Sequence, residues 1–576
     1  MKEREHKDYK LDDLDLELQN LPEDLELELQ KIPDETQMRR TSRPERQSAG
    51  MKNYRGRQDA VRSRDRMRRD AGQQREDLQA MNIQSQERAK RQRAEEKRWI
   101  DKEKRREDKE RKTVNKEFVR VTYIFVTLFM FMIGYLVYFN VVKSKEVVNS
   151  PYNVRQDLLA ERVVRGKIVD KNQNVLAETH VAEDGTESRS YPYGDVFAHV
   201  VGYSEKGKSG IESIQNFNLL TSNAFFLEKL KNEFQDQKNM GDTVVTTLDA
   251  NLQKAAYNAL GSQKGAVVVM EPDTGKILAM VSKPTYNPGT VVANWEALNN
   301  DPNSSLLNRA TLGQYTPGSV FKIVTTLAYM REDEQYSNYS HECTSEITED
   351  DTTIHCYQNR VHGSEDLRTA FANSCNTAYS SIGLDLNRTK WKETAEDLLF
   401  GKKLPCPLSY QTGKFVLDKS TDTAGTMMTA IGQGDTMVSP YHMALITSAI
   451  ANGGTLMKPY LVDQITNYDG ASVKKYMPEK YDDLMTPEEA ADLKSYMEAV
   501  VNQGTATALS GQGYTVAGKT GTAEVGMDKS SVNSWFVGFS NVENPELVVS
   551  VVIEDANTNY MTGVGVAKQI FNAYYY

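Results

Sequence analysis

The sequence predicts an α+β protein with a single transmembrane helix, a small extracellular pedestal domain, and a larger domain in which an antiparallel sheet flanked by helices adjoins an all-helical lobe. The first observation is one long uncharged apolar run, at residues 121–142. The second is strand-like segments with turn residues, at residues 266–282 and 515–553. The third is the mainly helical pattern between those segments, an order typical of a sheet covered by helices on both faces.

Charge is strongly segregated before the apolar run. Residues 1–37 carry 5 basic and 13 acidic side chains, and residues 38–120 carry 28 basic and 15 acidic ones. We therefore expect residues 1–117 to form a cytoplasmic charged arm that is largely disordered or an exposed helix. Its basic part could meet anionic lipid head groups. Nucleic acid is not expected as a partner, because no reader motif or row of aromatic residues accompanies the charge.

The acidic segment contains an imperfect duplication, Asp13–Pro22 followed by Asp24–Pro33. In each copy leucines alternate with carboxylates, and a proline closes the run where a strand ladder could not continue. The composition favours a disordered acidic tail. The alternative is a doubled docking strand for a cytosolic partner, with the leucines on one side.

The apolar run predicts a transmembrane signal anchor at residues 118–142. It is bracketed by Arg120 and Lys143, and at about 1.5 Å per residue it would span roughly 33 Å as a helix. No small-residue cleavage site follows it, so we expect it to stay uncleaved. The flank before it is far more basic than the flank after it. This bias predicts a cytoplasmic N-terminus, a single pass through the cell membrane, and an extracellular remainder.

Residues 143–246 are expected to form the pedestal domain. Arg165 and Glu212 lie in this segment. We interpret them as partners in ion pairs that hold the fold, because paired charges are more often structural than reactive.

The larger domain is expected at residues 247–576. It opens with apolar residues at helical spacing between Leu252 and Leu260. Two predicted strands, Ala266–Glu271 and Lys276–Ser282, then flank a turn with favourable turn residues.

The candidate for chemistry is the stretch Thr316–Lys322. Pro317-Gly318 predicts a tight turn, and the apolar spacing after it predicts that Ser319 opens a buried helix. A serine there is often only a helix cap. Lys322, however, lies one turn later on the same face, and burial can lower its pKa until it takes a proton near neutral pH. Ser319 then becomes a candidate nucleophile, with backbone N–H groups at the helix start suited to an oxyanion.

Two further motifs follow in order, Ser374-Cys375-Asn376 and Lys519-Thr520-Gly521-Thr522. The ordered trio S-x-x-K, S-D-N and K-T-G is the signature of class A β-lactamases and penicillin-binding proteins, and this chain has all three in order with an S-x-N variant of the second. Each motif supplies a different part of an acyl-transfer site, namely a nucleophile with its base, a polar bridge, and a cationic strand edge. S-x-x-K alone would be a weak signal, and the trio is specific.

Three further segments resemble sequence blocks of penicillin-binding proteins: Asn308-Arg309-Ala310, Gly432-Gln433-Gly434 and Trp535-Phe536-Val537-Gly538. With these motifs the chain, over about residues 150–576, resembles a class B penicillin-binding protein, a monofunctional peptidoglycan D,D-transpeptidase. The resemblance implies a serine transpeptidase/β-lactamase-like fold for residues 247–576.

The resemblance also implies catalytic roles. Ser319 would attack the carbonyl between the two terminal D-alanines of a stem peptide, with Lys322 taking its proton. Ser374 would relay a proton to the leaving D-alanine. Asn376 would hold the substrate amide and orient Lys322. No metal or organic cofactor is implied.

Substrate binding is assigned to the third motif in the same way. Lys519, with Thr520 and Thr522 around Gly521, would bind the terminal carboxylate that stem peptides and β-lactams share. The backbone N–H groups of Ser319 and Thr522 would form the oxyanion hole. Residues 143–246 are too few for the glycosyltransferase domain of bifunctional relatives. The family therefore implies a separate glycan polymerase of the SEDS type as a membrane partner.

Two other activities share these motifs. A membrane-anchored β-lactam-hydrolysing protein would need an efficient deacylation base, and no obvious carboxylate motif lies between Asn376 and Lys519 to supply one. A β-lactam-sensing protein would signal through its cytoplasmic arm, and residues 1–117 contain no recognisable effector domain. Both remain alternatives to the transpeptidase.

The four cysteines give a less specific signal. Cys343 and Cys356 lie near three histidines, and their spacing alone allows a metal site. The ligand order is irregular for zinc, which favours a disulfide or a pair of free buried thiols. Cys375, the middle residue of S-x-N, is expected to point away from the substrate, and Cys406 has no evident partner.

Overall fold

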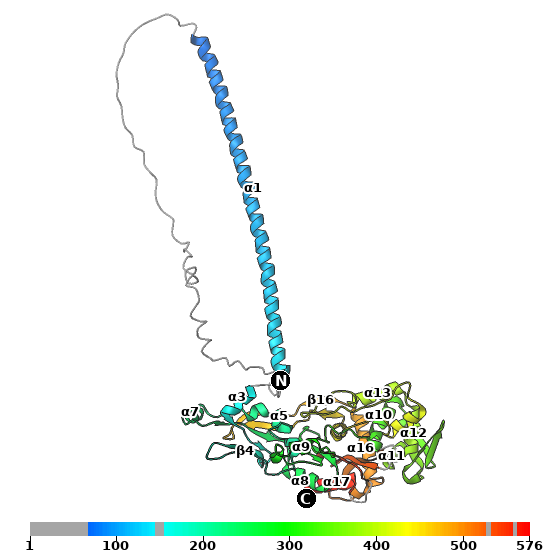
Figure 1. Cartoon of the computed structure of the whole chain (residues 1–576). Helices are drawn as coiled ribbons and strands as arrows, with labels where there is room; N and C mark the ends of the chain where they lie inside the picture. The colour runs from blue at the N-terminus through cyan, green and yellow to red at the C-terminus, as the bar shows by residue number, and fades with distance from the viewer. Residues whose placement is uncertain (1–66, 144–154, 526–530, 557–560) are drawn as a thin grey trace, which may run out of the picture. The chain divides into compact units, whose positions relative to one another are not determined.

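The computed structural model describes residues 67–143, 155–525, 531–556 and 561–576 (Figure 1). The duplicated acidic segment, residues 13–33, lies outside the described residues. The chain falls into two units that divide between Phe125 and Val126, and each is considered by itself.

The N-terminal helix α1 (Met67–Tyr138) is 72 residues long and continues as one π-helical segment, η3 (Phe139–Lys143). Residues 94–110 of its basic part are exposed, with an Arg106–Glu110 ion pair one turn apart at 3.3 Å. Among the described residues, one helical stretch is long and apolar enough to cross a membrane: Phe118–Lys143, with a mean hydropathy of 2.1. The predicted apolar helix is therefore present, one residue longer than expected.

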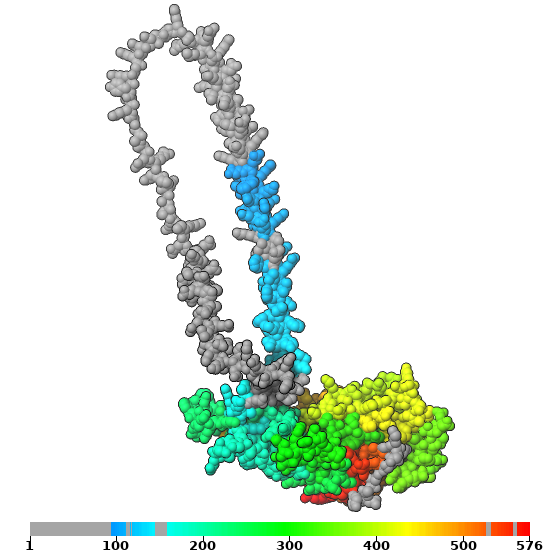
Figure 2. Space-filling model, viewed as in Figure 1, coloured from blue at the N-terminus to red at the C-terminus, as the bar shows by residue number. Residues whose placement is uncertain are grey.

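The pedestal sheet has six strands in the order β15-β14-β6-β2-β3-β4. Four of them come from the predicted pedestal segment: β2 (Ile168–Val169), β3 (Val175–Val181), β4 (Glu187–Ser190) and β6 (Thr243–Thr246). The other two, β14 (Val462–Thr466) and β15 (Ser472–Lys475), come from a segment more than 200 residues later. β14 pairs antiparallel with β6. In Figure 2 the cyan and green surface before residue 300 continues without a gap into the surface of later residues, in keeping with this pairing.

Short elements complete this region. They are α3 (Arg155–Arg162), α4 (Ala198–Val201), α5 (Gly210–Ile214), α6 (Asn216–Leu219) and α7 (Phe226–Phe234), with the parallel pair β1 (Val163–Val164) and β5 (Asn239–Met240).

A buried charge network lies in the predicted pedestal segment. Arg165 Nε donates to Glu212 Oε2 at 2.6 Å, and Arg189 Nε donates to Glu212 Oε1 at 2.8 Å. Burial alone would raise the pKa of the Glu212 carboxyl, but the two guanidinium groups hold it below its usual value. Breaking such a pair leaves an uncompensated buried charge, which costs about 3–5 kcal/mol. The prediction that Arg165 and Glu212 form ion pairs is confirmed.

The central sheet of the larger domain is antiparallel throughout, in the order β17-β18-β19-β7-β8. Its strands are β7 (Gly265–Met270), β8 (Ile277–Lys283), β17 (Val516–Val525), β18 (Ser531–Ser540) and β19 (Leu547–Ile553). β7, β8 and β19 are buried along their whole length, which requires cover on both faces. The antiparallel sheet and its first two strands were predicted correctly.

Helices provide that cover. α8 (Ala250–Leu260) and α17 (Gly563–Tyr575) pack on each other and on the sheet, and α15 (Pro440–Ala451) packs on β7, β18 and β19. The helix predicted to contain Leu252 and Leu260 is present as α8. It begins at Ala250, because the Asp249 side chain accepts hydrogen bonds from the backbone N–H groups of Asn251 and Leu252.

One short helix, α9 (Trp295–Asn299), precedes the first motif. The lobe between the motifs contains most of the remaining helices: α10 (Lys322–Glu332), α11 (Leu367–Ala372), α12 (Asn376–Asp385), α13 (Arg388–Asp397), α14 (Thr423–Ala430) and α16 (Pro487–Asn502). Single 3₁₀ turns are η4 (Pro288–Thr290), η5 (Gly318–Phe321), η6 (Tyr336–Asn338), η7 (Tyr357–Asn359) and η8 (Thr507–Leu509).

The lobe is not all-helical, so that prediction was wrong. β9 (Ser340–Cys343) pairs with β12 (Gly363–Asp366), and β10 (Glu346–Glu349) pairs with β11 (Thr352–His355). A third small pair joins β13 (Thr455–Met457) to β16 (Lys480–Asp483). The four strands β9–β12 have four residues each and are mostly polar and exposed, so they lack the apolar alternation by which a strand is recognised.

Candidate active site

The nucleophile candidate Ser319 lies in a turn where the backbone is tightly enclosed. Gly318, before it, has φ +56°, and a Cβ at that position would lie 2.6 Å from the carbonyl oxygen of Thr522. Gly318 N–H donates to Gly432 O at 2.9 Å, and Gly432 is itself at φ +74°. Glycine is therefore needed at both positions. This close packing sets the Ser319 turn against strand β17, and α10 begins three residues later, at Lys322.

The Lys322 side chain is fully buried and is held by the S-x-N segment. Its Nζ donates to Ser374 O at 2.7 Å, to Asn376 Oδ1 at 2.9 Å and to Ser374 Oγ at 3.2 Å. Burial lowers the pKa of Lys322 to about 8. Within the described residues Ser319 Oγ makes no hydrogen bond. The predicted contact between Lys322 Nζ and the Ser319 hydroxyl is therefore not a hydrogen bond in this structure. Catalytic hydrogen bonds are often long before substrate binds.

The second lysine of the site, Lys519, is fully buried in β17. Its Nζ donates to Ser374 Oγ at 3.0 Å and to Thr520 O at 3.1 Å. Burial lowers the pKa of Lys519 well below its usual value, and the nearby charge of Lys322 lowers it further. The Ser374 hydroxyl thus stands between two buried amines and can pass a proton either way.

Ser374 itself adopts an uncommon backbone conformation. It lies between α11 and α12 with φ +57°, in the left-handed region that a serine rarely occupies. Cys375 N–H donates to Ala370 O at 2.9 Å, and Asn376 Nδ2 donates to His355 O at 2.9 Å. These bonds fix the turn, and the strain fits a site where geometry matters more than local stability.

The K-T-G segment lies on the end strand of the central sheet. Gly521 packs against the nucleophile turn, since a Cβ there would lie 2.9 Å from Pro317 O. Thr522 is exposed, and Thr520 is half-buried. Thr520 Oγ1 lies 2.5 Å from Thr505 Oγ1. Thr505 is a neighbour that the sequence did not predict, because it belongs to no motif and offers only one hydroxyl group.

The structure thus brings the predicted site residues together. Lys322, Ser374, Asn376 and Lys519 form one hydrogen-bonded group. Ser319 joins it through the backbone packing of its turn against β17.

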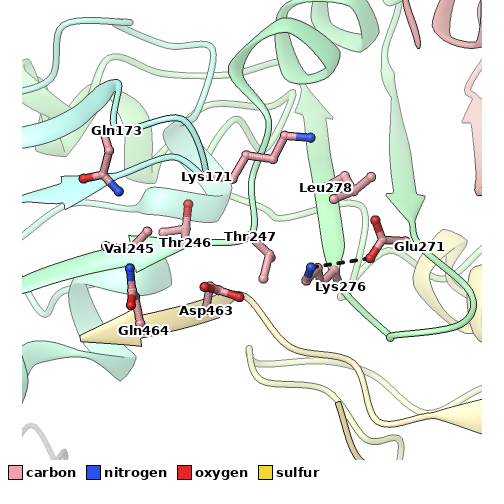
Figure 3. Close-up of a pocket in the computed structure, with 10 residues that line it drawn as sticks. All are labelled: Lys171, Gln173, Val245, Thr246, Thr247, Glu271, Lys276, Leu278, Asp463 and Gln464. Atoms are coloured by element: carbon pink, nitrogen blue, oxygen red, sulfur yellow. Dashed lines mark ion pairs between the residues drawn. The ribbon is translucent and has the colours of Figure 1, made fainter. Parts of the chain in front are cut away.

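A separate cavity of about 280 Å³ lies away from these residues, where the pedestal sheet meets β8 (Figure 3). Its lining is mainly polar, including Lys171, Thr246, Asp463 and an ion pair between Lys276 and Glu271 at 3.6 Å. None of the motif residues lines it. The catalytic candidates therefore lie outside this cavity.

Comparisons with known proteins agree with this geometry. The family model "Penicillin binding protein transpeptidase domain" matches residues 265–576, and "Penicillin binding protein A dimerisation domain" matches residues 165–244. The chain is 31% identical over 438 residues to the peptidoglycan D,D-transpeptidase PbpA of Mycolicibacterium smegmatis, covering 71% of this chain and 88% of that protein. It is 28% identical to stage V sporulation protein D of Bacillus subtilis, covering 69% of this chain and 64% of that protein.

Solved structures give the same picture. An imipenem acyl-enzyme complex of penicillin-binding protein A from Mycobacterium tuberculosis aligns with a TM-score of 0.66 and 27% identity, covering 72% of this chain and 98% of that one. The D,D-transpeptidase domain of a peptidoglycan glycosyltransferase from Eggerthella lenta aligns with a TM-score of 0.65 and 34% identity, over 72% and 98% of the two chains. Since the transpeptidase model spans more than half of the chain and contains all three motifs, the chain belongs to the class B penicillin-binding transpeptidases.

Proposed function

We propose that this chain is a peptidoglycan D,D-transpeptidase that cross-links stem peptides through an acyl-enzyme on Ser319 and is acylated by β-lactams. The observation that carries the proposal is the Ser374 hydroxyl held between Lys322 and Lys519, beside the Ser319 turn. Relatives named D,D-transpeptidase and an imipenem acyl-enzyme complex of one relative support it.

In the first step Ser319 Oγ attacks the carbonyl carbon between the terminal D-alanines, and Lys322 Nζ takes the hydroxyl proton. A neutral Lys322 can donate its two N–H groups to Ser374 O and Asn376 Oδ1, which leaves its lone pair for that proton. The backbone N–H groups of Ser319 and Thr522 stabilise the oxyanion. The close approach of Gly318 to the Thr522 carbonyl supports this pairing.

Lys519 and the hydroxyl groups of Thr520 and Thr522, around Gly521, bind the terminal carboxylate. A carboxylate beside Lys519 favours the protonated form of that lysine, and the resulting charge disfavours a proton on Lys322. Substrate binding therefore leaves the proton on Lys519 and frees Lys322 to act as the base.

Breakdown of the tetrahedral intermediate expels the terminal D-alanine. Ser374 passes a proton to the leaving nitrogen, while Asn376 holds the substrate amide. The amine of a neighbouring stem peptide then attacks the acyl-enzyme, forms the cross-link and restores the Ser319 hydroxyl.

Replacing the nucleophile tests the assignment directly. Ser319→Ala is expected to abolish covalent labelling by a fluorescent penicillin. Its free energy of unfolding should change by less than about 1 kcal/mol, because Ser319 Oγ makes no hydrogen bond within the described residues. Lys322→Arg is expected to abolish labelling as well, because a guanidinium group does not lose its proton. Labelling of the Ser319→Ala variant at a normal melting temperature would rule out Ser319 as the nucleophile. An adduct released in under a second would indicate a hydrolase instead.

The acylation rate should depend on pH through Lys322. Its pKa of about 8 means that the side chain gains a proton as the pH falls through that value. The rate constant for penicillin acylation is therefore expected to rise with pH and to level off above about pH 8, falling about tenfold per pH unit well below it. Stopped-flow labelling measures the profile, with thermal unfolding at each pH as the control for folding. A flat profile from about pH 6 to pH 9 contradicts the role of Lys322.

We also infer the membrane topology from the charge bias around the apolar helix, with residues 1–117 in the cytoplasm and the chain after Lys143 outside. Protease added to intact cells is expected to degrade the transpeptidase domain and to spare an epitope tag at the N-terminus. Degradation of the tag with protection of the domain would show the opposite orientation.

The same proposal includes two partners, a SEDS-family glycan polymerase in the membrane and a cytosolic protein that binds the duplicated acidic segment. Docking through alternate leucines depends on those leucines, whereas a solubilising tail does not. The test variant changes Leu16, Leu18, Leu27 and Leu29 to Ser, and the matched control changes Gln19 and Gln30 to Ser. The leucine variant alone is expected to lose its localisation and its cytosolic partner in pull-downs, while the polymerase is retained. Identical behaviour of both variants would contradict docking and would indicate a solubilising tail.

A further inference from the structure

Four potential metal ligands converge beside the S-x-N motif. Cys343 ends β9, Cys356 follows β11, His362 precedes β12, and Cys375 lies between Ser374 and Asn376. The three cysteines are buried and His362 is half-buried. Their ligand atoms all lie within 4.8 Å of one another. The sequence separates Cys343 from Cys375 by more than 30 residues, so the two hairpins of the lobe create this cluster.

Three of the six distances between the ligand atoms match a tetrahedral metal site. Cys343 Sγ is 3.7 Å from Cys356 Sγ, and Cys356 Sγ is 3.8 Å from Cys375 Sγ. His362 Nδ1 is 3.4 Å from Cys343 Sγ. Zinc bonds of about 2.3 Å to sulfur and about 2.0 Å to nitrogen place tetrahedral ligands roughly 3.8 Å apart for two sulfurs and roughly 3.5 Å apart for sulfur and nitrogen.

Of the two arrangements expected for Cys343 and Cys356, a disulfide or a pair of free buried thiols, the structure has the free buried thiols. All four cysteines are free thiols, and the Cys343–Cys356 separation of 3.7 Å is nearly twice the about 2.05 Å of an S–S bond. A bond between those two would also leave Cys375 and His362 outside it. One ion at the centre uses all four side chains.

We propose that Cys343, Cys356, His362 and Cys375 bind one zinc ion in a closed site with three thiolates and one imidazole. Four protein ligands leave no open position for a reacting water, so the ion is structural. Neighbouring groups suit a thiolate at Cys375: Ala378 N–H donates to its Sγ at 3.5 Å, and Thr377 Oγ1 lies 3.2 Å away. Thr377 Oγ1 also lies 3.0 Å from His341 Nε2, which adds an outer layer of hydrogen bonds around the ligands.

The site makes Cys375 a positioning residue for the catalytic lysine. Its two sequence neighbours, Ser374 and Asn376, provide the hydrogen bonds that hold Lys322. Ser374 is in a left-handed conformation that its surroundings must enforce. Asn376 is further tied to the backbone of His355, which precedes the ligand Cys356. Loss of the ion is therefore expected to loosen both contacts of Lys322.

Metal analysis of the full-length protein in detergent tests the site. Purified without chelator, the chain is expected to hold about one zinc ion by elemental mass spectrometry. Cys343→Ser, Cys356→Ser and Cys375→Ser should each lower zinc affinity at least tenfold. Cys406→Ser, the matched control away from the cluster, should retain zinc fully. Cobalt exchanged for zinc should show thiolate charge-transfer bands that only the three cluster variants lose.

Several results would overturn the site. They are a zinc content below about a tenth of the protein concentration, equal zinc in the Cys375→Ser and Cys406→Ser variants, or two reactive thiols instead of four in the unfolded, unreduced chain. The last result would indicate a disulfide. All of these measurements are independent of acylation, so they stand whether or not the transpeptidase assignment does.

The positioning role has its own test. Zinc removal by a chelator is expected to lower the rate of fluorescent penicillin labelling at least tenfold, and added zinc should restore it. Cys343→Ser, which leaves S-x-N intact, should lower the rate to a similar extent. Unchanged labelling in the zinc-free protein would overturn the positioning role. The ion would then stabilise the lobe without affecting Lys322.

Discussion

Two lysine side chains share one hydroxyl group inside this protein, and the site depends on that arrangement. Burial disfavours the charged form of each amine, and their proximity disfavours two charges together. Lys322 and Lys519 are both fully buried, and Ser374 Oγ lies 3.2 Å and 3.0 Å from their amines. Burying two amines side by side lowers the stability of the fold. The presence of this pair is better explained by acid–base chemistry, because strongly shifted pKa values with a specific partner cluster at functional sites.

Main-chain packing holds the first and third motifs against each other. Gly318 and Gly521 allow the nucleophile turn and the edge of β17 to meet with no side chain between them. β17 pairs along ten residues with β18, so the edge that carries Lys519 is rigid. The base and the carboxylate-binding strand are therefore set by backbone contacts, which a substrate does not have to organise.

Local patterns predicted the parts of the fold that have local causes. The Pro317-Gly318 turn, the apolar strand β7 and the capped helix α8 each follow from a few adjacent residues. The pairing of β6 with β14 could not be predicted, because its partners lie more than 200 residues apart and both strands are short. Thr505 beside Thr520 was missed for the same reason, since only the fold brings its hydroxyl there.

The cysteine cluster beside the active site also could not be predicted from local sequence patterns. Cys375 was considered as the middle of a catalytic motif, and Cys343 with Cys356 as a separate pair, because the sequence gives no reason to join them. In the fold, the hairpins that bring them together contain few buried apolar residues: β10 has none, and β11 has one, Ile354.

Such small elements cannot build a core of their own, and a structural metal is one way to stabilise them. The ion that holds the hairpins would also fix the residue between Ser374 and Asn376. Folding of the hairpins formed by β9–β12 and alignment of Lys322 are then coupled, because both depend on the same four ligands.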